Sequence, residues 1–205
     1  MTDHPGAQAM WDERYSVEAY VYGTEPNSFL RENVSSLPTG DLLCLAEGEG
    51  RNAVFLAATC RRVSSVELTE AGVAKTLRLA TAVGVSVDAV VGDLADYDLG
   101  VDRWDAIVSI FAHMPSPVRV DLHKRVVASL RPGGVFLLEA YTPDQIGRGT
   151  GGPASADLMM TIEGLRSELE PLELVHAEER EREIVEGTHH TGIGSVVQVI
   201  ARKKV

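Results

Sequence analysis

The sequence predicts an α/β fold of the doubly wound type, in which helices cover both faces of a mostly parallel sheet. From about residue 40, apolar runs alternate with stretches of helical period. These runs are apolar throughout, which is typical of parallel strands buried on both faces. The chain has 205 residues, enough for one substantial core. We therefore expect a single domain over residues 1–205.

Three strands and two helices are expected in the first half of this pattern. Continuous apolar runs predict the strands, and stretches with a period near 3.6 residues predict the helices. The second helix carries Val73, Ala74, Leu77 and Ala80 on one face and stops at Gly84, which suits a helix C-cap. The expected strands are 42–46, 63–67 and 87–91, and the expected helices are 52–60 and 70–83.

A further unit of strand, helix and strand follows at 104–111, 116–130 and 135–140. Ser116 and Pro117 suit the N-cap and the first turn of the helix. Pro132-Gly133-Gly134 separates this helix from the next strand. Ligands of such folds bind beyond the carboxyl ends of the strands, so we expect the site at that edge of the sheet.

The last part of the chain predicts an antiparallel edge. Two long strand patterns, 172–185 and 195–202, flank Glu186-Gly187, and a tight hairpin joins only antiparallel strands. We expect an edge hairpin over residues 170–204. The charge run at 178–183 is interpreted as a solvated strand face. His189-His190 has no ligand partners at a metal spacing, so we expect a turn there and no metal site.

Composition excludes several classes of function. The formal net charge is −11, which disfavours binding to nucleic acid. No apolar run approaches the ~20 residues that span a bilayer, and the N-terminus lacks a signal-peptide pattern. Cys44 and Cys60 are interpreted as buried thiols of a reducing compartment. A cytoplasmic protein without membrane or nucleic-acid partners is expected, with its oligomeric state open.

The junction after the first strand carries a glycine pattern, in the stretch LCLAEGEGRNAVFLA. Gly48 and Gly50 allow a ligand to approach the turn between strand and helix, and Glu67 ends the second strand where it can accept hydrogen bonds from ribose. This pattern suits NAD or S-adenosylmethionine. Asp93 ends the third strand, where it can accept from an adenine amino group. The acids around the glycines favour a sulfonium cation over a pyrophosphate.

Taken together, the segments LCLAEGEGRNAVFLA, VSSVELTEAGVAKT, VVGDLADY, WDAIVSIFAHMP and LRPGGVFLLEAYT resemble the class I S-adenosylmethionine-dependent methyltransferases. The subgroup they resemble is the small tellurite-resistance (TehB-like) and thiopurine methyltransferase-like group. The resemblance covers residues 41–141, the expected cofactor-binding core. It extends to Trp11-Asp12-x-Arg14-Tyr15 in an expected helical cover over residues 1–36. It implies a seven-stranded sheet in the order 3-2-1-4-5-7-6, with strand 7 antiparallel.

The resemblance also implies a set of cofactor contacts. Residues of the glycine turn lie along the methionine part of the cofactor, the end of strand 2 holds the ribose, and the end of strand 3 reads the adenine. The implied residues are Glu47, Gly48 and Gly50 for methionine, Glu67 and Leu68 for ribose and adenine, Asp93 and Leu94 for the adenine edge, and Ser109 in strand 4. Cys44 and Ala46 stand where the family often has an acid and a glycine, and Glu47 is expected to compensate for the first.

Residues at the rim of the site are candidates for contact with the methyl acceptor. His113 follows strand 4 and is the candidate catalytic acid–base; the alternative is a loop histidine that bonds only the backbone. Tyr15, Tyr22 and Tyr141 are candidates for lining the pocket, and Arg148, in a glycine-rich loop, is a candidate lid residue. Simple packing of the tyrosines and a merely flexible loop remain the alternatives.

The function expected from the sequence is transfer of a methyl group from S-adenosylmethionine to a small-molecule acceptor by in-line displacement. The subgroup resemblance favours a soft nucleophile or an oxyanion as acceptor. Two rival functions stay open. One is an NAD(P)-dependent oxidoreductase, and the other is a non-catalytic protein that binds S-adenosylmethionine.

Overall fold

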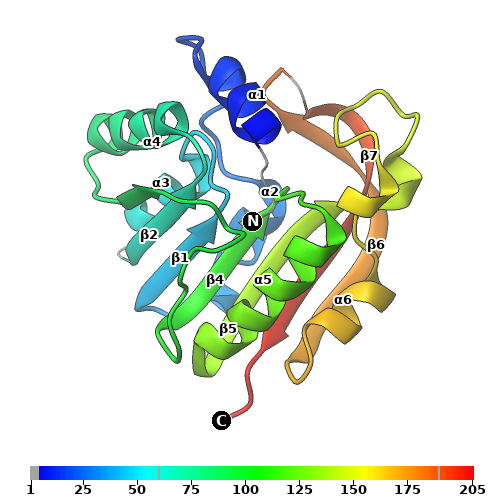
Figure 1. The fold of residues 1–205 in the computed structure, drawn as a ribbon. Coiled ribbons are helices and arrows are strands. Elements are labelled where there is room, and N and C mark those ends of the chain that lie inside the picture. The colour runs from blue at the N-terminus through cyan, green and yellow to red at the C-terminus, as the bar shows by residue number, and fades with distance from the viewer. Residues whose placement is uncertain (1–4, 60, 189) are drawn as a thin grey trace.

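The centre of the molecule is a seven-stranded sheet in the order β3-β2-β1-β4-β5-β7-β6 (Figure 1). The computed structural model describes residues 5–59, 61–188 and 190–205. Strand β7 runs antiparallel to both of its neighbours, β5 and β6. The predicted fold class is therefore confirmed. The strands are Asp41–Leu45 (β1), Arg62–Glu67 (β2), Asp88–Val91 (β3), Trp104–Ile110 (β4), Leu130–Tyr141 (β5), Glu173–Glu186 (β6) and His190–Arg202 (β7).

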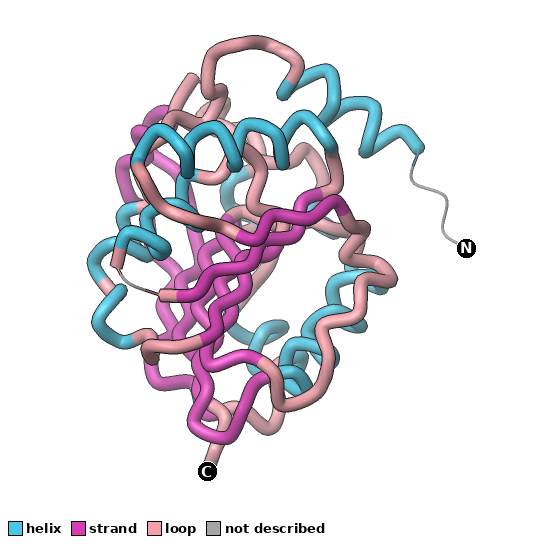
Figure 2. The backbone as a smooth tube through the Cα atoms, turned by 90° about the vertical axis from the view of Figure 1, so that its left-hand side faces the viewer, coloured by secondary structure: helices cyan, strands magenta, loops and turns pink. Residues whose placement is uncertain are grey.

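Helices lie on both sides of the strands, as Figure 2 shows. Side chains of α2, α3 and α4 join the core layer on one face of the sheet, and side chains of α5 and α6 join the layer on the other. Within the described ranges, no helix is long and apolar enough to cross a bilayer. The helices are Pro5–Tyr15 (α1), Ser28–Glu32 (α2), Arg51–Ala58 (α3), Glu70–Val83 (α4), Ser116–Ser129 (α5) and Ile162–Glu168 (α6), with short 3₁₀ turns at Val34–Ser36, Pro143–Gln145 and Ala156–Leu158.

The two core layers follow from the alternation of side chains along each strand. In β1, Leu42 and Cys44 enter the layer under α3, whereas Leu43 and Leu45 enter the layer under α5. All four are at most 2% exposed. Both faces of the central strands are thus removed from water, which explains why these strands are continuous apolar runs.

Two strands end one residue earlier than predicted, because the next residue has a left-handed backbone. Ala46, expected to close the first strand, has φ +47°, and Phe111, expected to close the fourth, has φ +54°. A residue with a Cβ is strained in this region. Both turns lie at the carboxyl edge of the sheet, where backbone strain is commonly found next to functional sites.

The strain at Ala46 gives a stability prediction. Replacing Ala46 by glycine removes a left-handed penalty of ~1–2 kcal/mol and adds the ~0.5–1 kcal/mol entropy cost of a glycine, so we expect a net stabilisation of ~0.5–1 kcal/mol. Urea unfolding of Ala46→Gly measures the change. The matched control is Ala57→Gly in helix α3, which is expected to lose ~1 kcal/mol. A lower free energy of unfolding in both variants would show that the Ala46 backbone is not strained.

The helix predicted at 116–130 starts differently from the expectation. Ser116 is its first helical residue rather than its N-cap, and Pro115 takes the cap position without a side-chain bond. The Ser116 hydroxyl instead donates to Asp157 Oδ1, at 2.5 Å. The following strand, β5, already begins at Leu130, where it pairs with Trp104 before an irregularity in the register.

The buried face of α4 also differs from the prediction. Leu77 is 44% exposed, whereas Lys75 is 2% exposed and Thr76 is buried. The apolar pattern misled the assignment because the helix buries a charged residue. Lys75 Nζ lies 2.6 Å from Glu49 Oε1, so the charge of the ammonium group is compensated inside the protein.

The C-terminal strands form a long hairpin whose pairing runs from Glu173↔Arg202 to Glu186↔His190. His190 is the first residue of β7, so the expected turn does not include it. The interpretations of His189 and Cys60 lie outside the described residues. Cys44 is buried in β1.

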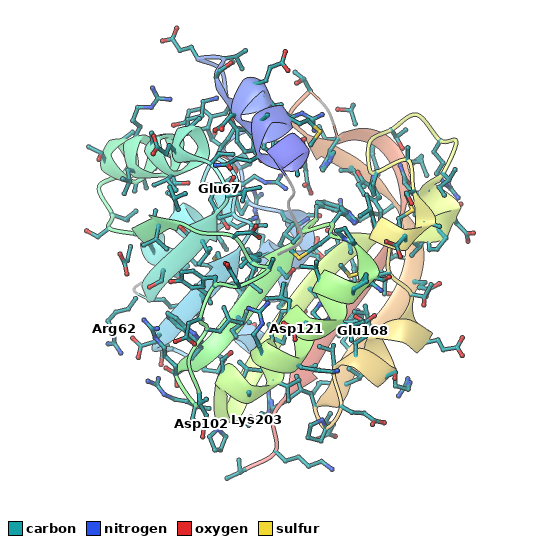
Figure 3. The ribbon with its side chains drawn as sticks, in the orientation of Figure 1. Arg62, Glu67, Asp102, Asp121, Glu168 and Lys203 are labelled. Carbon is teal, nitrogen blue, oxygen red and sulfur yellow. The ribbon has the colours of Figure 1, made fainter. Side chains whose placement is uncertain are left out.

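An ion-pair cluster fastens α6 to α5. Figure 3 shows Glu168 between the two helices. Arg119 donates to both carboxylate oxygens of Glu168, and His123 Nδ1 lies 2.6 Å from Glu168 Oε2. Burial alone raises the pKa of Glu168, but the bonds from His123 and Arg119 outweigh it and lower the pKa to about 2. The ionised carboxylate is therefore part of the folded structure.

This cluster predicts a loss of stability in acid. The folded pKa of Glu168 lies below the ordinary value of ~4.3, so its contribution is present above pH ~4.3 and is lost as the pH falls towards 2. We expect the free energy of unfolding of the wild type to exceed that of Glu168→Gln by up to ~3 kcal/mol at pH 6. This difference in stability should narrow as the pH falls from 4.5 to 3. Urea unfolding of both proteins across this range measures the gap. A gap that does not depend on pH would contradict the assignment.

Candidate functional site

The glycine turn between β1 and α3 is shaped partly by packing within the protein. Gly50 has φ +99°, and a Cβ built there meets the Thr76 Cα at 2.6 Å. The backbone that approaches Gly50 is therefore that of helix α4. Gly48 has φ +66°, and a Cβ there meets the Tyr15 hydroxyl at 2.9 Å. Of the two glycines, Gly48 faces the space beneath the N-terminal helix.

Glu47 closes the start of α3. Its Oε1 accepts from the backbone N–H groups of Asn52 and Ala53, both at 2.8 Å. Burial raises the pKa of Glu47 to about 7, against the lowering effect of these bonds. The carboxylate also contacts the Cys44 thiol, whose pKa is raised by burial and by Glu47. A carboxylate thus lies beside position 44, as the expected compensation requires.

Glu49, the second acid of the turn, is 3% exposed and serves the architecture. Besides its ion pair with Lys75, its Oε2 accepts from the Tyr22 backbone N–H at 3.1 Å. Lys75 also donates to the Ala19 carbonyl at 2.7 Å. The pair therefore fixes the segment between α1 and α2 onto α4. The charge of Glu49 is thus compensated by Lys75, whereas Glu47 and Glu67 bond backbone N–H groups of α3 and of the glycine turn.

Glu67 ends β2 and holds the glycine turn. Its Oε2 accepts from Gly48 N at 2.9 Å, and its Oε1 accepts from the Thr69 N–H and hydroxyl. Glu67 lies below α1 at the edge of the sheet (Figure 3). It is 5% exposed, and burial raises its pKa. The neighbouring Leu68 carbonyl accepts from Gln8 of α1 at 3.5 Å.

Asp93 follows β3 and starts a turn. Its Oδ1 accepts from Ala95 N at 2.8 Å, and the side chain is exposed, whereas Leu94 is buried. Arg125 of α5 donates to the carbonyls of Leu94 and Tyr97, at 2.6 and 2.8 Å. The sequence did not single out Arg125. No sequence pattern predicts this role, because the loop contacts of Arg125 are made to backbone carbonyls about 30 residues away.

Ser109 and His113 lie at the end of β4 and just beyond it. Ser109 is 4% exposed and pairs with Leu45 of β1. His113 Nδ1 lies 2.8 Å from the Leu158 carbonyl, and Tyr141 N donates to its Nε2 at 3.5 Å. Burial lowers the pKa of His113 to about 4. Both nitrogens of a neutral ring are therefore engaged with backbone groups, which favours the alternative interpretation that His113 positions a loop.

Helix α1 lies closed over the glycine turn. Tyr15 is 6% exposed and stacks on Trp11 at 5.4 Å, and the Tyr22 ring lies 6.4 Å from that of Tyr15. Burial, followed by the charge of Glu67, raises the pKa of Tyr15. Arg14 donates to the Tyr22 hydroxyl at 2.8 Å and lies over the Trp11 ring. The structure thus brings Tyr15 and Tyr22 to the site.

Tyr141 and Arg148 have different surroundings. Tyr141 is fully buried at the end of β5. Arg148 donates to Glu181 Oε1 of β6 at 2.6 Å and to the Asp144 carbonyl. This ion pair compensates the charge of Arg148 and holds its loop against the hairpin.

An aromatic cluster lies where β4 and β5 end and β7 begins. It is made of Tyr22, Phe111, His113, Tyr141 and His190. Phe111 stacks on Tyr141 at 4.6 Å, and the His190 ring stands edge-on to both. His190 also lies 4.7 Å from Tyr22. The cluster therefore joins the N-terminal cover to the carboxyl edge of the sheet.

A buried polar network supports this edge from below. Glu139, which is fully buried in β5, accepts from Arg182 of β6, Gln198 of β7 and Asn27 at the start of α2. Asn27 also donates to Glu186. The charge run at 178–183 predicts a solvated face that includes Arg182, which is wrong for this residue: its side chain is 11% exposed. A glutamate inside the apolar run VFLLEAY is the signal that could have revealed the network.

The residues around Gly48 fit an adenosyl sulfonium better than a dinucleotide. Carboxylates end both β2 and β3, where they can accept from ribose hydroxyls and an adenine amino group. A pyrophosphate needs a free cation or free N–H groups. Arg51 and Lys75, two cations of this region, are paired with Glu186 and Glu49. Glu67 accepts from Gly48 N in the turn, and Glu47 accepts from the Asn52 and Ala53 N–H groups at the start of α3.

Comparisons with known proteins identify what the chain is similar to. The family model described as a methyltransferase domain matches residues 42–134. TehB from Haemophilus influenzae matches with a TM-score of 0.73 at 17% identity, over 96% of this chain and 67% of TehB. The N-methyltransferase NodS from Bradyrhizobium japonicum WM9 matches with a TM-score of 0.67 at 14% identity, over 100% of both chains. At these identities the solved structures establish the fold. The comparison with curated protein sequences finds no match.

Proposed function

We propose that the chain, whose residues 42–134 form a methyltransferase domain as the class I family resemblance implies, transfers a methyl group from S-adenosylmethionine to a small-molecule acceptor. The observation that carries the choice of cofactor is the charge pattern at the glycine turn. Glu67 at the end of β2 bonds Gly48 N, Asp93 follows the neighbouring strand β3, and the cations Arg51 and Lys75 are paired with Glu186 and Glu49.

Each proposed cofactor residue has a task that its position supports. The Glu67 carboxylate accepts hydrogen bonds from the ribose hydroxyls. Asp93 accepts a hydrogen bond from the adenine amino group through Oδ2, since its Oδ1 already accepts from Ala95 N. Arg125 positions the adenine loop through its carbonyl contacts. The turn at Gly48 lies along the methionine part. The bound cofactor supplies an activated methyl group with a good leaving group.

Helix α1 controls access to this site. Glu67 is 5% exposed and the Tyr15 hydroxyl lies against the Gly48 turn, so the cofactor enters when α1 moves away. After closure, Tyr15 and Tyr22 exclude water from the methyl group and hold the acceptor in line with it. In this proposal the reaction needs no strong base to activate the methyl donor, since the sulfonium is already a good leaving group.

His113 acts in this proposal as a positioning residue. Its neutral ring links the Leu158 carbonyl to the Tyr141 backbone and so fixes the loop after β4 against β5. The role of a general base at neutral pH is open to a residue with a free nitrogen, and both nitrogens of His113 are engaged.

Thermal unfolding with S-adenosylmethionine, S-adenosylhomocysteine and NAD tests the proposed cofactor. A ligand present at ~100 times its dissociation constant adds ~2.7 kcal/mol to stability, which raises the midpoint by roughly 5 to 10 °C for a chain of this size. We expect this shift with both adenosyl ligands and none with NAD.

The other outcomes identify the rivals. A shift with NAD alone would establish the oxidoreductase and reject the proposal. A shift with the adenosyl ligands, followed by no turnover of any acceptor in a screen, would favour the non-catalytic binding protein.

A further inference from the structure

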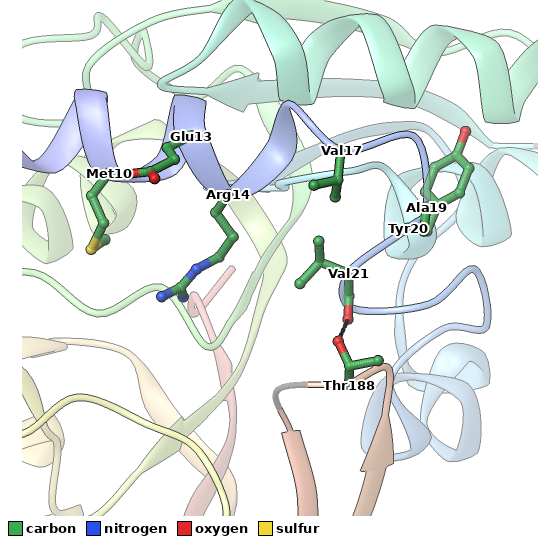
Figure 4. Close-up of a pocket in the computed structure, with 8 residues that line it drawn as sticks. All are labelled: Met10, Glu13, Arg14, Val17, Ala19, Tyr20, Val21 and Thr188. Atoms are coloured by element: carbon green, nitrogen blue, oxygen red, sulfur yellow. Dashed lines mark hydrogen bonds between the residues drawn. The ribbon is translucent and has the colours of Figure 1, made fainter.

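A cavity of about 440 Å³ lies between helix α1 and the tip of the β6–β7 hairpin (Figure 4). Its volume is in the range of small-molecule sites. None of the residues proposed to contact the cofactor lines it, so it is a second candidate site. The residues of its lining that carry the argument are Met10, Glu13, Arg14, Val17, Val21 and Thr188.

One part of this lining is apolar. Figure 4 shows the side chains of Val17 and Val21 facing each other. Met10 of α1 also lines the cavity. Met10 is 44% exposed and Val17 is 49% exposed. A ligand that covers these side chains removes apolar surface from water, which favours a ligand with an aliphatic group.

Another part of the lining carries two opposite charges. Glu13 and Arg14 are adjacent in α1, yet they form no ion pair with each other or with any other residue that the structure describes. Figure 4 shows both side chains leaving α1 beside the cavity. A carboxylate next to a guanidinium group is complementary to a ligand that carries an ammonium group and an anion. The charge pattern therefore favours a zwitterion.

Arg14 is held in position before any ligand binds. Its Nη1 donates to the Tyr22 hydroxyl at 2.8 Å, and its guanidinium group lies 4.8 Å from the centre of the Trp11 ring. Neither partner is a carboxylate, so the positive charge remains available to an anion. A side chain that is already ordered loses little entropy on binding. Because the neighbouring Glu13 repels a doubly charged phosphate more than a carboxylate, the anion expected at Arg14 is a carboxylate.

A second cavity, of about 380 Å³, lies between the segment after α1 and helix α4 and allows a comparison. Glu18 and Arg78 line it, and both are exposed. No ion pair or ring contact to a described residue orders the Arg78 side chain. Of the two cavities, the one at Arg14 is therefore better prepared to bind a ligand.

We propose that the cavity between α1 and the hairpin tip binds a small α-amino acid with an aliphatic side chain, and that the bound amino acid holds α1 closed. Its carboxylate bonds Arg14, its ammonium group bonds Glu13, and its side chain covers Val17. The ligand contacts α1 and the hairpin tip at once, so it favours the position of α1 in which the cavity exists. The site itself is independent of the proposed methyl transfer, whereas the effect on α1 rests on the proposed role of this helix as the cover of the cofactor.

Chemical-shift titration of the ¹⁵N-labelled protein without cofactor tests the site. The probes are L-leucine, 4-methylpentanoate, which lacks the amino group, 3-methylbutylamine, which lacks the carboxylate, and glycine, which lacks the aliphatic side chain. We expect saturable shifts with leucine, in α1 and at Thr188. The dissociation constants of the other three probes should be about tenfold higher or more.

Two variants assign the charged groups by their selectivity. Arg14→Gln should weaken the binding of leucine and 4-methylpentanoate about tenfold and leave that of 3-methylbutylamine unchanged. Glu13→Gln should weaken leucine and 3-methylbutylamine about threefold, a smaller effect because Glu13 is exposed, without weakening 4-methylpentanoate. A misfolded variant would lose all probes alike, so this pattern reports recognition. The matched controls Glu18→Gln and Arg78→Gln, in the second cavity, should leave every dissociation constant unchanged.

Equal affinities for leucine and 3-methylbutylamine, or shifts confined to the second cavity, would overturn the proposed site. Equal losses of leucine affinity in the Arg14 and Arg78 variants would overturn it as well.

The same titration with saturating S-adenosylhomocysteine separates this inference from the proposed function. Leucine should then bind about fivefold more tightly, because both ligands favour closed α1. Loss of leucine binding would mean that leucine had occupied the methionine part of the cofactor site, which rejects the second site. An unchanged affinity would reject the effect on α1. If S-adenosylhomocysteine does not bind at all, the proposed function fails, and the titration without cofactor still decides whether the amino acid binds.

Discussion

Replacing Glu139 by alanine is expected to lower the free energy of unfolding by ~3–5 kcal/mol, the largest stability effect predicted for this chain. Glu139 is fully buried, and its two oxygens accept from Arg182, Gln198 and Asn27. Removing it leaves the guanidinium group of Arg182, in a desolvated site, with Glu186 and the Glu183 carbonyl as its partners among the described residues. Urea unfolding, followed by far-UV circular dichroism, measures the loss.

The same strand ladder offers a control for this experiment. Glu178 pairs across β6 and β7 with Gln198, as Glu139 does across β5 and β7, but its side chain is 46% exposed. Glu178→Ala is expected to change stability by less than ~0.5 kcal/mol. Similar small losses in the two variants would mean that the buried network does not hold α2 and the hairpin to the sheet.

The second large effect is on the cofactor. Glu67→Gln keeps the shape of the side chain and removes the negative charge of the carboxylate, which accepts hydrogen bonds from the ribose hydroxyls in the proposed complex. Hydrogen bonds to a charged acceptor contribute ~1.5–3 kcal/mol, so the dissociation constant of S-adenosylhomocysteine is expected to rise ~10- to 100-fold. Isothermal titration measures the constant directly.

Glu70→Gln is the matched control for Glu67→Gln. Glu70 is exposed in the first turn of α4, three residues along the chain. Its replacement removes the same charge without touching the site, so the affinity should stay within about twofold. An unchanged affinity in Glu67→Gln would place the ribose elsewhere and reject the proposed role of this carboxylate.

The sheet was predictable because its strands are buried on both faces. Runs such as Leu42 to Leu45 are apolar without interruption, and Gly84 ends α4 as the expected C-cap residue. The antiparallel hairpin followed from two long strand patterns around Glu186-Gly187. The order of the strands came from the family resemblance, since hydrophobic period alone does not set it.

The parts that escaped prediction depend on contacts between distant segments. Lys75 lies on the buried face of α4 because Glu49 compensates its charge, and apolar pattern gives no weight to such a pair. The sequence around Arg182 predicts an exposed charge in an acidic run. Its burial depends on the ion pair with Glu139 of β5, which the sequence pattern does not show. The sequence also gave no sign that Gly50 is required by Thr76, as its motif suggested a ligand.

The candidate site shows the same division. The strand-end carboxylates at 67 and 93 were assigned from spacing, and the structure puts them at the ends of neighbouring strands. The engaged nitrogens of His113 and the unpartnered atoms of Tyr141 and His190 depend on how the loops after β4 and β5 pack against each other and against β7. Only three-dimensional neighbours decide which of these polar groups remain available.

The contact between the hairpin tip and the segment after α1 has a consequence for synthesis on the ribosome. Thr188 N donates to the Val21 carbonyl at 2.9 Å, and Gly187 packs so closely there that a Cβ would meet Val21 O at 2.1 Å. The segment around Val21 therefore cannot take its final place until the hairpin tip, 166 residues later at Gly187, has been synthesised. At ordinary elongation rates this interval is roughly 10 to 30 s. The nascent chain can pair its central strands during that time, but it acquires a closed site only after the tip of the β6–β7 hairpin has emerged.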